Sequence, residues 1–196
     1  NTDDGDIKFQ CDDGSGGVET YFFLDGSISS GNPFTVFPDD SILTFGNSQD
    51  LQLKHSSGNS NIDNTAGGDL VIRQFVDDKD IIFQSDDGSG GVQTYFFLDG
   101  SVNSTVFPDS SKLYFGTSHD SYIEHDGTNT YLSNATGKLI IRNTLDDSDI
   151  ELVCDDGSGG NTAYITLDGS ETRTVIAKAM RFNDSTSLQL GGDADI

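Results

Sequence analysis

The chain lacks Trp and is poor in Pro, Met and basic residues. Its 196 residues contain three Pro, one Met and 10 Lys and Arg against 33 Asp and Glu, for a formal net charge of −23. Binding to a nucleic-acid backbone or to an anionic membrane needs basic patches, and none is present. No stretch approaches the roughly 20 apolar residues of a membrane-spanning helix. We therefore expect no nucleic-acid partner and no membrane insertion.

Cysteine is also scarce. Cys11 and Cys154 occupy equivalent places in two copies of an internal repeat, and Ser85 fills that place in the remaining copy. A disulfide framework would need positions that pair within the repeat. We expect two half-buried free thiols, with a bridge between chains as the alternative. Their redox state stays open.

Low apolar content with high net charge is typical of disordered chains, and only 33% of the residues are hydrophobic. Here, however, 13 Phe and 6 Tyr fall largely in alternating positions. Alternation of apolar and polar residues indicates half-buried β-strands rather than a solvated coil.

An internal repeat dominates the sequence. The segment 6–17 returns as 80–91 and again as 149–160, and the segment 55–64 returns as 125–134. Such self-similarity indicates a repeat architecture. We divide the chain into repeat 1 (1–79), repeat 2 (80–148) and repeat 3 (149–196).

The third repeat is expected to be truncated. Leu190 and Ile196 stand where Phe45 and Leu51 stand in the first copy, so the third copy stops before its His segment. The chain also opens with Asn, without a signal peptide. We interpret it as a piece of a longer polypeptide.

Each repeat predicts short strands and glycine-containing turns. Ile7, Phe9 and Cys11 form one apolar face, and residues 13–17 form a turn because Gly tolerates positive φ. The return strand is expected to present Val18, Thr20, Phe22 and Leu24 on one face, opposite Tyr21 and Phe23. Further alternation is seen at Leu51, Leu53, His55, Ile62, Leu70 and Ile72. Residues 177–182 are the one candidate for a helix, of a turn or two.

These strands need partners that one chain does not provide. An isolated hairpin is marginal in water, and exposed strand edges invite pairing with other chains. The repeat of about 70 residues is longer than the 20–50 residues typical of solenoids. We therefore predict an all-β fold of tandem β-hairpin repeats that form an elongated shaft, as an intertwined parallel homotrimer.

Two segments carry a family resemblance. The run from His125 to Leu132, followed by Thr136–Arg142, and the run Ala177–Asp184 resemble repeats of tail-fibre and virion structural proteins of marine bacteriophages, including cyanophages. The first repeat departs from the pattern, with Ser56–Ser57 in place of Asp-Gly. The resemblance implies an elongated, trimeric, all-β fibre on a virion. It also implies contact with host cell-surface glycans through other parts of the fibre.

Acidic turns are the first candidate metal sites. Oxygen-rich turns suit Ca²⁺, although these turns lack the ligand spacing of an EF-hand. The alternative is a solvated hairpin turn. The residues concerned are Asp12, Asp13, Asp86, Asp87, Asp155 and Asp156.

Histidines are the second candidate. An extended strand points Leu51, Leu53 and His55 to one face, and Ile123 and His125 repeat this arrangement. Around a three-fold axis, three imidazoles can bind a transition metal. The alternative is that each His bonds the turn that follows it.

The expected function is therefore structural: a segment of a phage tail fibre or virion appendage, located on the virion or outside the cell. No serine-nucleophile elbow or phosphate loop is present, and we do not expect an enzyme. A bacterial surface adhesin or filament is one alternative. A carbohydrate-binding or depolymerase module is the other, with Tyr21, Tyr95, Tyr164, Phe23 and Phe97 as sugar-stacking platforms.

Overall fold

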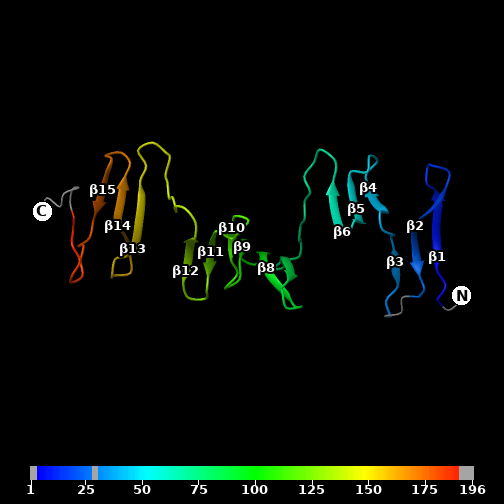
Figure 1. Cartoon of the computed structure of the whole chain (residues 1–196), viewed down its shortest axis with the longest axis horizontal. Coiled ribbons are helices and arrows are strands. Elements are labelled where there is room, and N and C mark those ends of the chain that lie inside the picture. Colours follow the sequence, from blue (N-terminus) through cyan, green and yellow to red (C-terminus); the bar gives the residue numbers. More distant parts are fainter. Residues whose placement is uncertain (1–3, 28–30, 190–196) are drawn as a thin grey trace. The chain divides into compact units, whose positions relative to one another are not determined.

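The computed structural model describes residues 4–27 and 31–189, and its secondary structure there is all-β. Fifteen strands form five small antiparallel sheets of three strands each, and no helix occurs in these two ranges. Every sheet is built from strands that follow one another in the sequence, as the colours of Figure 1 show. The predicted all-β class and the hairpins are thus confirmed.

The sheets have similar sizes and the same simple order. The first two are β1 (Ile7–Asp12), β2 (Val18–Asp25) and β3 (Phe34–Val36), then β4 (Ile42–Phe45), β5 (Leu51–Ser56) and β6 (Asn59–Asn64). The next two are β7 (Ile81–Asp86), β8 (Val92–Asp99) and β9 (Ser104–Val106), then β10 (Leu113–Phe115), β11 (Ser121–His125) and β12 (Thr130–Asn134). The last is β13 (Ile150–Asp155), β14 (Asn161–Asp168) and β15 (Arg173–Ile176).

The described residues divide into two units. One lies within residues 1–81 and 98–104, and the other lies within residues 82–97 and 105–196. Leu190 and Ile196, on which the truncation of the third repeat was inferred, lie outside the described residues. No helix in the part of the chain described is long and apolar enough to cross a membrane.

A β-bulge in the first hairpin changes which residues share a face. Ile7 pairs with Leu24 and Phe9 with Phe22, but the register then shifts, and Gln10 pairs with Thr20. Tyr21 is the extra residue, so Val18 and Thr20 no longer share the face of Phe22 and Leu24. The predicted alternation of the return strand was wrong at this point, because a bulge places two residues opposite one.

The hairpin between β5 and β6 has a two-residue turn. Ser56 pairs with Asn59, and the intervening Ser57 and Gly58 both have positive φ, 51° and 79°. Positive φ at both central residues defines the type I′ turn, whose twist matches that of the flanking strands. The equivalent turn in the second copy is longer, and there Asp126 accepts hydrogen bonds from the N–H groups of Thr128 and Asn129.

Two predicted elements are missing. Leu70 and Ile72 belong to no strand, because no other strand of the described chain pairs with them. Residues 177–182 form no helix either. A helix of six residues is marginal in water unless it packs on a neighbour, and no side chain within the described residues is buried.

The sheets enclose no core. No side chain within the described residues is buried, hydrophobic or polar. Cys11 and Cys154 are accordingly exposed, where half-buried thiols were expected, because nothing in the single chain covers them. The apolar faces of the sheets thus lie open to solvent in one chain.

Candidate functional site

The acidic turn between β1 and β2 is organised by its own aspartates. The Oδ1 of Asp13 accepts hydrogen bonds from the Ser15 N–H at 2.7 Å, the Ser15 hydroxyl at 2.8 Å and the Gly17 N–H at 3.0 Å. Asp12 Oδ1 accepts one from the Gly14 N–H at 2.6 Å. Asx bonding of this kind fixes a turn without help from outside.

The same geometry recurs in the other two acidic turns. Asp87 accepts from Ser89 and Gly91, with the Gly91 bond at 3.0 Å, and Asp86 accepts from Gly88. Asp156 accepts from Ser158 and Gly160, and Asp155 accepts from Gly157. The structure therefore gives all six predicted carboxylates a role in holding their turns.

These bonds favour the charged form of the central carboxylates. Hydrogen bonds from the Gly17 and Ser15 N–H groups lower the pKa of Asp13. The hydroxyl of Ser89 lowers the pKa of Asp87, and the hydroxyl of Ser158 lowers that of Asp156, each with help from backbone N–H groups. Hydrogen bonds to a carboxylate stabilise its ionised state. The turns thus remain anionic.

One tyrosine in each hairpin holds the other side of these turns. The hydroxyl of Tyr21 donates to the backbone carbonyl of Asp12 at 3.1 Å. Tyr95 and Tyr164 donate to Asp86 and Asp155 in the same way, each at 3.0 Å. Each hydroxyl is therefore used within its own hairpin, although the Tyr21 side chain is 50% exposed. Bracing of the hairpin accounts for these tyrosines.

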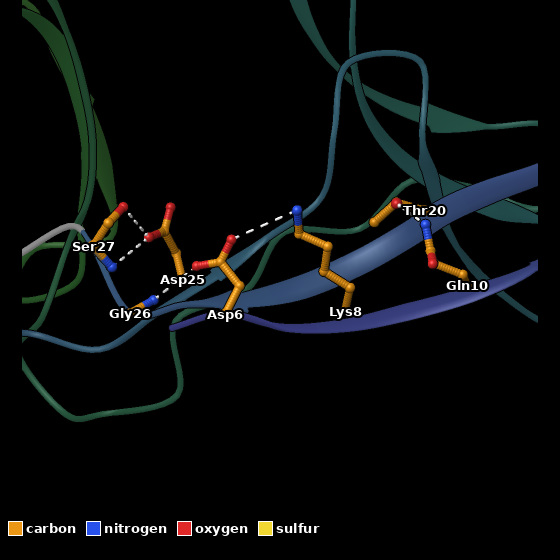
Figure 2. Close-up of polar contacts among 7 residues, drawn as sticks. All are labelled: Asp6, Lys8, Gln10, Thr20, Asp25, Gly26 and Ser27. Carbon is orange, nitrogen blue, oxygen red and sulfur yellow. Dashed lines mark hydrogen bonds and ion pairs between the residues drawn. The ribbon is translucent and has the colours of Figure 1, made fainter. Parts of the chain in front are cut away.

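Sequence reasoning missed a polar corner at the opposite end of each hairpin. Asp6 Oδ1 accepts from the Gly26 N–H at 3.2 Å, and Asp25 Oδ1 accepts from both the N–H and the hydroxyl of Ser27 (Figure 2). The Lys8 Nζ lies 3.8 Å from the Asp6 Oδ2, an ion pair that adds to the corner. A Cβ on Gly26 would meet the Gly5 carbonyl oxygen at 2.5 Å, so only Gly fits there.

The corner recurs at a fixed spacing. Asp80 accepts from Gly100 at 3.0 Å, and Asp149 accepts from Gly169 at 2.9 Å. The separation is twenty residues in each copy, as it is between Asp6 and Gly26. That constant spacing was visible in the sequence and could have revealed the contact.

The histidines bond hydroxyl groups across their hairpins. His55 Nδ1 lies 3.0 Å from Ser60 Oγ, and His125 Nδ1 lies 3.2 Å from Thr130 Oγ1. The partners stand directly opposite on the paired strand, not in the turn itself. The local role is thus cross-strand. Whether three copies converge on a metal depends on contacts between chains.

Stacked rings form the apolar face of the first and third sheets. The ring centroids of Phe9 and Phe22 are 4.4 Å apart, with an interplanar angle of 13°. Phe37 stacks on the other side of Phe22 with a centroid distance of 5.7 Å. The third sheet repeats this with Phe83, Phe96 and Phe107 at the same separations. In the last sheet all three positions are aliphatic: Leu152, Ile165 and Ile176.

The opposite face of these sheets carries a polar contact where the aromatic rings are present, and it lacks that contact in the last sheet. Gln10 donates to Thr20 at 3.0 Å, and Gln84 donates to Thr94 at 3.0 Å. The equivalent pair in the last sheet is Val153 and Ala163. The side chains that meet in one sheet are replaced as a set, which indicates that the contacts are specific.

The described residues of one chain do not assemble a metal centre. Among the residues described, no three His, Cys, Asp or Glu side chains lie together so that they could hold a metal ion. A site on the predicted residues would need ligands from more than one chain. The residues predicted from the sequence instead hold the turns of their own hairpins.

Comparison with known proteins does not place the chain in a family. It matches no protein-family model, no curated protein and no solved structure.

Proposed function

We propose that this chain is a structural shaft segment of a homotrimeric virion appendage, of the kind found in phage tail fibres, and that it supports host attachment without catalysing a reaction. One observation carries the proposal: the sheets have apolar faces, yet no described residue is buried. Folded proteins bury such faces in a core or in an interface. Here an interface with other copies takes the place of the core.

The exposed area supports association. The chain exposes 15878 Å². Two separate folded bodies of half its mass would together expose about 10,900 Å², so about 5,000 Å² per chain is in excess of what folded units expose. Extensive obligate interfaces bury areas of this order. A pairwise surface contact of standard size would leave most of the excess uncovered.

The charge supports an elongated arrangement. Three chains carry 3 × −23 = −69 formal charges. Charges of one sign repel one another within about a Debye length, roughly 8 Å at physiological salt. A shaft spreads them along its length, whereas a compact trimer would concentrate them.

The repeat supports a structural role. The acidic turns, the polar corners and the tyrosine contacts recur in three copies with nearly the same distances. An active site is ordinarily a unique arrangement in a cleft, whereas a scaffold repeats its elements. The resemblance of residues 125–132, 136–142 and 177–184 to virion fibre repeats points in the same direction.

Negative-stain electron microscopy with a subunit count tests the proposal. We expect thin rods of uniform width with three chains per cross-section. Round particles of one chain would contradict it. A glycan array with the same preparation should give no binding, because receptor contact belongs to other parts of the fibre. Specific glycan binding would favour the lectin alternative.

The genomic setting separates the two structural alternatives. A neighbouring capsid gene is expected for a virion appendage. If the neighbouring genes encode bacterial surface export and not a capsid, a bacterial adhesin or filament would be favoured.

A further inference from the structure

Two matched apolar segments lie outside every sheet. The first unpaired segment, residues 70–76, reads Leu-Val-Ile-Arg-Gln-Phe-Val, and the second unpaired segment, residues 139–145, reads Leu-Ile-Ile-Arg-Asn-Thr-Leu. Neither contains a strand in the structure. Both are rich in the β-branched residues that strands prefer. Their sequence therefore calls for a pairing that the single chain does not supply.

Most of the backbone of these segments has no backbone partner in the described chain. The exceptions stand at the ends, where the Val76 carbonyl accepts from the Lys79 N–H and the Leu145 carbonyl accepts from the Ser148 N–H. No backbone hydrogen bond is made by residues 70–75 or 139–142 within the described structure. Backbone N–H and C=O groups that are covered by apolar side chains must be paired, because they lose their hydrogen bonds to water. Such a run of free groups is the edge at which another chain can add a strand.

The side chains are exposed on both faces. Ile72 is 62% exposed and Phe75 84%, while Ile140 and Ile141 are 73% and 63% exposed. Consecutive apolar residues on an extended chain point to opposite faces. Continuous apolar runs of this kind are typical of strands that are covered on both faces, unlike the alternating strands of one-sided sheets.

Each of the two segments contains an arginine without a partner in the described chain. Arg73 and Arg142 make no ion pair and no hydrogen bond within the described chain, although the chain has 33 acidic residues. Lys54 pairs with Asp63 at 2.9 Å and Lys112 with Glu124 at 3.5 Å, whereas Lys79, Lys138, Lys178 and Arg181 also lack an ion pair among the described residues. Another copy of this acidic chain offers the carboxylates that these two guanidinium groups lack.

We propose that residues 70–76 and 139–145 are interchain β-strands, each paired through its backbone with a neighbouring copy of this chain. The apolar side chains are then buried between chains, and Arg73 and Arg142 contact carboxylates of the neighbour. The inference rests on the proposed homotrimer and assigns the segments that intertwine its chains. It also accounts for part of the excess exposed area.

Hydrogen exchange on the assembled 196-residue chain tests the inference. We expect the amides of residues 71–75 and 140–142 to exchange at least about 100-fold more slowly than unprotected amides, as paired strands do. The Gly16 and Gly90 amides serve as the reference for weak protection, because they lie in exposed turns and donate no hydrogen bond within the described chain. A trimer in which residues 71–75 and 140–142 exchange at unprotected rates would overturn this inference and leave the homotrimer standing. A monomer would overturn both.

A pair of variants provides a second measurement. Ile72→Asp with Ile141→Asp adds charge at both segments and is expected to shift the mass from trimer to single chain at the same concentration. Val102→Asp adds one charge per chain, against two in the double variant, at a turn residue that is 63% exposed, and it should leave the trimer intact. A double variant that stays as trimeric as the Val102 control would contradict the pairing.

Discussion

Removing the central ring of an aromatic stack tests whether the sheet faces are covered by other chains. Phe22 lies between Phe9 and Phe37, with ring centroids at 4.4 and 5.7 Å. In the single chain Phe22 is only half-buried. The cost of Phe22→Ala therefore depends on what lies over the face.

Two limits can be worked out. If the face stays open, the variant loses two ring contacts, about 1–3 kcal/mol in total. If other copies cover the face, Phe22 is a core residue, and its truncation costs about 3–5 kcal/mol per chain. With an unfolding entropy of about 0.41 kcal/mol/K for a chain of this length, the covered case lowers the melting temperature by about 7–12 °C and the open case by about 2–7 °C.

The assay is thermal unfolding followed by circular dichroism, with the mass checked before each scan. The control is the triple variant Phe9→Leu, Phe22→Ile and Phe37→Ile, which gives the first sheet the aliphatic set of the last sheet. We expect it to melt closer to the wild type than Phe22→Ala does. A Phe22→Ala variant that melts less than about 7 °C below the wild type would refute the covered face, and one within about 2 °C of the wild type would refute the ring contacts as well.

Three further predictions concern charge and ligands. The pKa values of Asp13, Asp87 and Asp156 are lower in the folded chain than the ordinary value of 3.8, so at pH values above 3.8 these carboxylates stabilise the fold. This stabilisation is lost as the pH falls through the folded-state pKa. The triple Asp→Asn variant should thus melt below the wild type near neutral pH and approach it in strong acid. A constant difference across pH would contradict this. Because the chain has a formal net charge of −23, its melting temperature should fall at very low ionic strength. NaCl should restore it in part, and Ca²⁺ or Mg²⁺ more fully. A melting temperature that does not respond to any of the three would show that charge crowding is negligible. If His55 and His125 form metal layers, elemental analysis should find Zn, Ni or Fe that His55→Ala with His125→Ala removes. A metal-free assembly unchanged by chelator would leave only their contacts with hydroxyl groups.

The hairpins could be predicted because their pattern is local. Alternation at Ile7 and Phe9, followed by the glycine turn at 13–17, specifies two strands that meet. The bulge at Tyr21 could not be seen, since the residue continues the alternation and only the register of the partner strand reveals it. Nor does alternation reveal the Asp6–Gly26 contact, which depends on how both strands end.

The missing strand at Leu70 and Ile72 has a different origin. Its sequence has the composition of a strand, and the prediction failed only because a strand is defined by its partner. The candidate metal residues differ again. Their types were identified in the sequence, but their hydrogen bonds within the turns of one chain became visible only in the structure.

The central claim is that the apolar faces are covered by other copies of the same chain, and sedimentation equilibrium tests it most directly. Three chains of 21.0 kDa predict a species of about 63 kDa at all loading concentrations above micromolar. A single species of 21.0 kDa that keeps its β-sheet signal under the same conditions would contradict the account, because the sheets would then be stable with their faces open.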